Sequence, residues 1–65
     1  MWVEFMTVRN AYAAETWREL FAAEGLAIRV IPPVGMGESA TMQDARTLYV
    51  PTGKAHVARE IMRKI

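Results

Sequence analysis

Five residues interrupt regular structure in this chain, and their spacing limits what it can fold into. A helix start is predicted at Asn10, whose side chain can accept a bond from a free backbone N–H, and a helix end at Gly25, which tolerates a left-handed backbone. Pro32 and Pro33 end one strand and Pro51 ends another, because proline has no N–H to donate to a sheet. The segments between them carry the apolar patterns of short strands and helices.

Three of these segments have the composition of β-strands. They are short, rich in β-branched and aromatic residues, and their apolar side chains alternate along the chain. We predict strands at Trp2–Val8, Leu26–Ile31 and Arg46–Val50.

Two segments have helical periodicity. Alanine at five positions favours the first helix, and Thr52 can cap the second. In the first helix, Ala13, Trp17, Leu20, Phe21 and Glu24 recur at helical spacing and form its predicted stripe. That of the second is Val57, Ala58, Ile61, Met62 and Ile65.

The element order is therefore β-α-β-β-α. The first helix joins two parallel strands by a crossover, which is expected to be right-handed, and the third strand inserts between them. We predict an α+β, ferredoxin-like domain over residues 1–65, with a three-stranded antiparallel sheet of order 1-3-2 and both helices on one face.

Strict alternation sorts the strand residues onto two faces. The face toward the helices is predicted to hold Val3, Phe5, Leu26, Ile28, Val30, Leu48 and Val50. The other face combines aromatic, apolar and charged residues, and strand 1 is an uncovered edge. We predict that two copies associate there, with these interface residues: Trp2, Glu4, Met6, Arg29, Ile31 and Tyr49.

Composition excludes several function classes. The 65 residues include no cysteine, so there is no disulfide, thiolate metal site or cysteine nucleophile. A 52% hydrophobic fraction in so short a chain favours association. The net charge of +1 is far from the strongly basic charge of a typical nucleic-acid-binding domain. No signal peptide and no apolar run long enough to span a membrane is visible. We expect a cytoplasmic homodimer, or a domain with another protein partner, that binds neither nucleic acid nor membrane.

The stretch between strands 2 and 3, residues 32–45, is long for a connection. Its glycine-rich part could cradle an anion with backbone N–H groups, through Gly35, Gly37, Glu38 and Ser39. A phosphate loop would normally lead into a helix and supply a lysine, whereas this one leads into a strand. A connection without a ligand remains the alternative.

Catalytic residues are sparse. His56 is the only histidine, and no Asp, Glu and His cluster has metal-ligand spacing. Glu15 and Glu19 share a helix face, but Arg18 follows Glu15 by three residues, which indicates a solvated surface. We predict neither enzymatic activity nor a cofactor or metal.

The segments AAETWRELFAAEGLAIRV and RTLYVPTGKAHVAREIMRKI, almost the whole chain, resemble a small bacterial family of prokaryotic signal-transducing proteins. The resemblance implies the ferredoxin-like fold of the P-II nitrogen regulators, with a regulatory loop between strands 2 and 3. It does not extend to nucleotide binding, because no phosphate-binding residues match. AEGLAIRVIPP also resembles the start of small domains proposed as sulfur or selenium carriers, but those rely on a cysteine that is absent here.

These observations lead to two hypotheses. The first is a non-enzymatic regulatory or protein-interaction domain that acts as a homodimer. The alternative is a small-molecule or nucleotide sensor whose 32–45 loop closes on an anionic ligand. RNA binding by the aromatic residues of the sheet is a weaker explanation, since the RNA-recognition signature segments and the fourth strand are missing.

Overall fold

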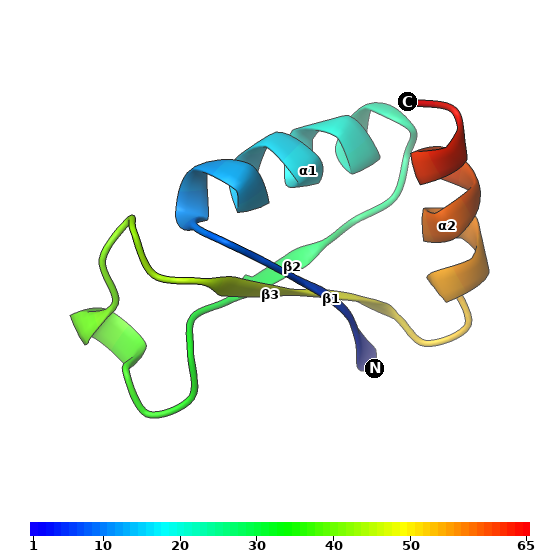
Figure 1. Cartoon of the computed structure of the whole chain (residues 1–65). Helices are drawn as coiled ribbons and strands as arrows, with labels where there is room; N and C mark the ends of the chain where they lie inside the picture. Colours follow the sequence, from blue (N-terminus) through cyan, green and yellow to red (C-terminus); the bar gives the residue numbers. More distant parts are fainter.

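The computed structural model describes residues 1–65 and confirms the predicted fold class (Figure 1). A three-stranded antiparallel sheet has the order β1-β3-β2, and both helices lie on one side of it (Figure 1). A single 3-10 turn, η1 (Gly37–Ser39), lies in the connection between β2 and β3. The elements are β1 (Trp2–Val8), α1 (Ala11–Ala23), β2 (Arg29–Ile31), β3 (Arg46–Pro51) and α2 (Ala55–Arg63).

Helix α1 begins and ends as the sequence predicts. The Asn10 side chain accepts a hydrogen bond from the backbone N–H of Ala13 at 2.8 Å. Gly25 follows the last turn with a φ of 87°, a left-handed conformation that disfavours residues with a Cβ. The predicted stripe is rotated, because Leu20 is 36% exposed whereas the small Ala11 and Ala14 are buried. Short side chains at these positions let the helix backbone approach the sheet closely.

Helix α2 begins at Ala55, two residues later than a cap at Thr52 implies. The backbone N–H and the hydroxyl of Thr52 instead donate to the carbonyl oxygen of Met1, at 2.8 and 3.1 Å. Thr52 therefore fixes the start of β1 beside the end of β3 and does not cap the helix. Within α2, Ala58 and Ile61 are buried as predicted, while Ile65 lies beyond the last turn and is exposed.

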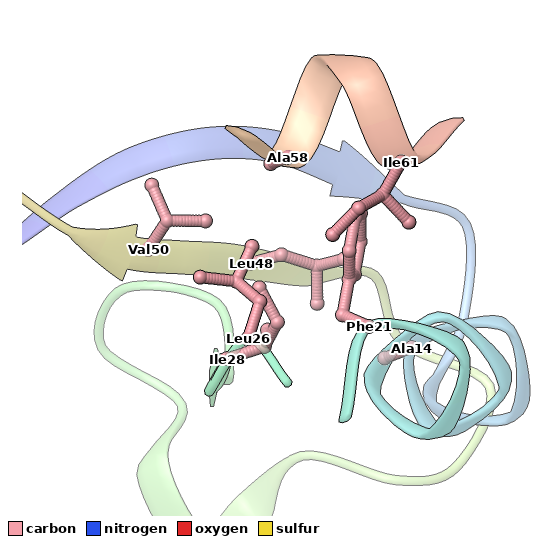
Figure 2. Packing of buried hydrophobic residues seen from close by; sticks show 8 residues of the cluster. All are labelled: Ala14, Phe21, Leu26, Ile28, Leu48, Val50, Ala58 and Ile61. Carbon is pink, nitrogen blue, oxygen red and sulfur yellow. The ribbon is translucent and has the colours of Figure 1, made fainter. Parts of the chain in front are cut away.

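The hydrophobic core fills the space between the sheet and the two helices (Figure 2). Phe21 projects from α1 toward Leu48 on the central strand and Ile61 on α2, and all three are almost completely buried. Leu26 and Ile28 are buried in the segment before β2, so this segment contributes to the core although the strand itself starts at Arg29. The core cluster is Ala14, Phe21, Leu26, Ile28, Leu48, Val50, Ala58 and Ile61.

Strand β1 contains a bulge that reverses its faces halfway along. Glu4 pairs with Tyr49 and Met6 pairs with Leu48, so Phe5 is an extra residue without a partner on β3. Phe5 and Met6 both pack against the core. The prediction from strict alternation is therefore correct up to Phe5 and wrong beyond it.

Candidate interaction surface on the sheet

No helix or strand covers the sheet face away from α1 and α2, and the β2–β3 loop with η1 projects to this side beyond one end of the sheet (Figure 1). Its members follow from strand pairing, because directly opposed residues of an antiparallel pair lie on the same face. We call this surface the open face; it consists of Trp2, Glu4, Thr7, Arg29, Ile31, Thr47, Tyr49 and Pro51.

A shallow pocket of about 270 Å³ lies on the open face. It is lined by residues from all three strands, with Tyr49 of the central strand between its neighbours. The guanidinium carbon of Arg29 lies 5.5 Å from the ring centroid of Trp2, within cation–π range. Aromatic rings, the apolar Ile31 and one cation thus surround a single hollow. Such a lining suits an aromatic or apolar group whose edge carries negative charge.

Opposite charges flank the centre of the open face. Glu4 on β1 and Arg29 on β2 are both opposite Tyr49 on β3, so the three residues form a row across the sheet. The ion pairs of the chain join Arg18 to Glu15, Arg63 to Glu60 and Lys64 to Glu24, and none of them involves this row. Neither charge of the open face is therefore held in an ion pair within the chain, although the Arg29 guanidinium contacts the Trp2 ring.

Five of the six predicted interface residues lie on this face, and Met6 does not. The bulge at Phe5 turns Met6 toward Leu48 and the core, so its predicted place on the open face is wrong. Thr7 occupies the open face instead, with its hydroxyl 3.4 Å from that of Thr47. Strict alternation assigns Thr7 to the core. The bulge that moves Thr7 to the open face leaves no signal in the sequence, because β1 contains no glycine or proline.

The predicted anion-binding residues of the loop do not form a hollow. Gly35, Gly37, Glu38 and Ser39 are all exposed, and the pocket of the molecule lies elsewhere. The N–H of Ser39 is already donated to the carbonyl oxygen of Met36, at 2.7 Å.

The second half of the loop is tied to helix α1. Arg46 donates three hydrogen bonds to backbone carbonyl oxygens, those of Asp44, Ala45 and Thr41, at 2.7, 3.1 and 2.9 Å. The Asp44 carboxylate accepts from the N–H and hydroxyl of Thr41. The N–H of Ala11, at the first position of α1, donates to the carbonyl oxygen of Met42 at 3.0 Å. Residues 41–46 are thus held by the same helix end that the sequence marks with Asn10.

The other side chains considered for catalysis lie apart on exposed surface. Arg18 donates to both carboxylate oxygens of Glu15, at 3.2 and 2.6 Å. These hydrogen bonds hold the pKa of Glu15 below its ordinary value of 4.5, whereas a general acid needs a raised pKa. His56 is exposed on α2. No group of three or more His, Cys, Asp or Glu side chains is placed to hold a metal ion.

Neither helix has the length and apolar character that crossing a membrane requires. Comparisons with protein-family models, with curated proteins and with solved structures find no match to this chain. The open face is therefore interpreted from its own residues.

Proposed function

We propose that this protein is a non-enzymatic protein-interaction domain of regulatory type that acts as a homodimer through the open face. The observation that carries the proposal is the pocket between Trp2, Arg29, Ile31 and Tyr49, on a sheet face that no element covers. Tryptophan, tyrosine and arginine are the residues most often found as energetic anchors of interfaces. Three of the four pocket residues belong to this class.

The need for a partner follows from the size of the core. Only nine of 65 residues are buried, and the chain has no disulfide to add stability. Small domains without disulfides or a structural metal commonly obtain the missing stability by oligomerisation. Covering Trp2 and Tyr49 would stabilise the dimer by roughly 25 cal/mol for each Å² of apolar surface that is removed from water.

The expected dimer is of modest affinity. Three strands of seven, three and six residues, about 4.8 Å apart, present a face of at most roughly 15 by 20 Å. Stable complexes bury about 800 Å² of accessible surface per partner, so this face alone falls well below that size and into the class of weak, transient contacts. We therefore expect dissociation in the micromolar range, which suits a regulated association.

The regulatory character is inferred from the resemblance to the bacterial signal-transducing family and from the loop. Residues 32–45 occupy the connection in which that family's fold would carry its regulatory loop. The absence of cysteine fits a cytoplasmic setting for such a protein.

Light scattering across protein concentrations tests the homodimer. We expect Trp2→Glu and Tyr49→Glu to shift the equilibrium toward monomer, because each substitution places an unpaired carboxylate in the interface twice. Tyr12→Glu is the matched control, since Tyr12 is an exposed aromatic residue on α1, far from the open face. A wild-type mass close to the 7.3 kDa of one chain at high concentration would contradict the homodimer.

The sensor hypothesis is tested separately by thermal shift with ATP, ADP and inorganic phosphate. A large nucleotide-dependent rise in melting temperature, abolished by substitutions in residues 35–39, would favour the sensor over the interaction domain. A dimer that responds to none of these compounds would favour the interaction domain.

A further inference from the structure

The row of residues across the open face restricts how two copies can meet. Glu4 and Arg29 lie on opposite sides of Tyr49, each one strand away from it. Neighbouring strands are about 4.8 Å apart, so the Cα atoms of Glu4 and Arg29, two strands from each other, are separated by about 10 Å. A two-fold axis that runs along the strands and one that runs across them bring these charges to different partners.

We propose, building on the homodimer proposed above, that the two copies pack face to face about a two-fold axis that runs along β3 above Tyr49. Rotation about this axis exchanges the two flanks of the sheet. Glu4 of each copy then faces Arg29 of the other, and the two Tyr49 rings meet near the axis. The interface gains two equivalent ion pairs, because a two-fold contact uses every residue pair twice.

The opposite choice of axis is unfavourable. A two-fold axis that runs across the strands keeps each flank above its own copy, so Glu4 would face Glu4 and Arg29 would face Arg29. Like charges brought together at an interface weaken it and exclude that arrangement. Both axes leave the strands of the two sheets nearly aligned, which is one of the two common ways in which sheets pack, so the charges decide between them.

The pocket agrees with this geometry. Tyr49 is one of its walls, so the pocket borders the proposed axis. Its volume of about 270 Å³ is large enough to accept an aromatic side chain of the second copy. The Arg29 guanidinium, which lies above the Trp2 ring, would be turned toward the carboxylate of Glu4 in that copy.

Cross-linking can identify the axis, since the chain has no cysteine of its own. Packed sheets are about 10 Å apart, too far for a direct disulfide, so a short bismaleimide is the suitable probe. We expect an equimolar mixture of Glu4→Cys and Arg29→Cys proteins to give a cross-linked dimer between the two variants. Each variant alone should give little. Tyr49→Cys should cross-link to itself, and Tyr12→Cys serves as the control away from the interface.

Neutral substitutions give a second measurement with opposite signs for the two axes. If Glu4 faces Arg29, Glu4→Gln and Arg29→Gln each remove two attractive contacts, and the dimer dissociation constant should rise about three- to ten-fold. If like charges face each other, each substitution removes a repulsion and the dissociation constant should fall. Arg29→Gln also removes the contact with Trp2, so the direction seen with Glu4→Gln decides.

The outcomes separate this proposal from the one on which it rests. Wild-type protein that stays monomeric, with no cross-linking of Tyr49→Cys, would overturn the homodimer itself. Cross-linking of Tyr49→Cys together with self-linking of Glu4→Cys, or tighter association of Glu4→Gln, would leave the homodimer standing and overturn the axis along β3. Cross-linking between Glu4→Cys and Arg29→Cys supports both.

Discussion

Phe21 lies at the centre of the core, and its ring is fully buried. The Phe5 ring meets it edge-on, with centroids 6.2 Å apart, and the Trp17 ring stacks on it at 5.8 Å. These contacts join β1 to two successive turns of α1. Trp17 itself is only half-buried, because it lies at the outer margin of the stripe.

We expect Phe21→Ala to lower the free energy of unfolding by about 3–5 kcal/mol, since the cavity would open inside a closed core. Trp17→Ala should lower it by only about 1–2 kcal/mol, because solvent can fill the space that it leaves. Urea denaturation followed by circular dichroism measures both values. Phe21→Leu is the control, with an expected change below about 1.5 kcal/mol. Equal losses for the two alanine variants would contradict this placement of the side chains.

At the scale of the element, β1 is the least regular strand. The unpaired Phe5 shifts the register between Glu4 and Met6, so the first half of the strand faces the core with its odd-numbered residues and the second half with its even-numbered ones. Bulges are common at sheet edges, where they also disturb the row of free N–H and C=O groups. The outer edge of β1 is thus a poorer template for another strand than its length implies.

Lysine substitutions on either side of this register shift test the bulge. Met6→Lys should destabilise the protein by about 2 kcal/mol or more, because it turns a charge toward the core beside Leu48. Thr7→Lys should change the stability by less than about 0.5 kcal/mol, since Thr7 is exposed. Thermal melts of the two variants, run beside wild type, give the comparison. Strict alternation requires the opposite ranking.

The two halves of the loop between β2 and β3 differ in how they are held by hydrogen bonds. Residues 34–40 are stabilised only by short-range backbone hydrogen bonds, whereas Arg46 and the N–H of Ala11 hold residues 41–46. We expect amide hydrogens in 34–40 to exchange within the fastest group of the chain and those of Thr41 and Asp44 to exchange more slowly. Arg46→Met should abolish this difference. Protection in 34–40 equal to that of the strands would show that the whole loop is packed.

The sequence predicts the elements better than the details inside them. Asn10, Gly25 and the prolines act through local backbone chemistry, so the limits of α1 and the ends of β2 and β3 could be predicted. The bulge depends on how Phe5 and Met6 both find room against Phe21 and Leu48, which is a tertiary effect. The role of Thr52 is a tertiary effect too. Its local sequence predicts a helix cap, whereas its hydrogen bonds go to Met1, 51 residues away.

The candidate site was predictable where it depends on residue type and uninterrupted alternation. Trp2 and Glu4 precede the bulge, and Arg29, Ile31 and Tyr49 lie on strands without one. Met6 alone was misplaced, because it follows the bulge. The row that Glu4, Tyr49 and Arg29 form could not be predicted, since the register between strands is set by packing and by the long β2–β3 connection.

The whole molecule is thin, with principal extents of 32, 24 and 14 Å. The smallest extent accommodates one sheet and one layer of helices, and within these residues the open face carries no second layer (Figure 1). Folding and association should therefore be linked, because a dimer adds its interface to the small core of each copy.

This linkage predicts that the melting temperature of wild-type protein rises with protein concentration. The Tyr49→Glu variant should melt at a lower temperature that does not depend on concentration, since a monomer gains nothing from mass action. Differential scanning calorimetry over the micromolar range measures both. A concentration-independent wild-type melting temperature would argue against an obligatory link between folding and dimer formation.

The bulge at Phe5 also affects how this chain should be compared with others. The pairs on the two sides of the bulge, Glu4 with Tyr49 and Met6 with Leu48, are consecutive on β3, so we expect a homologue that lacks Phe5 to fold with the same two faces. Its β1 would match this one only if the alignment opens a gap of one position inside the strand. An alignment that forbids gaps in strands would match core residues to exposed ones over half of β1. Relatives should therefore be aligned on the two sides of Phe5 separately, with the Glu4–Tyr49 and Met6–Leu48 pairs as the fixed points.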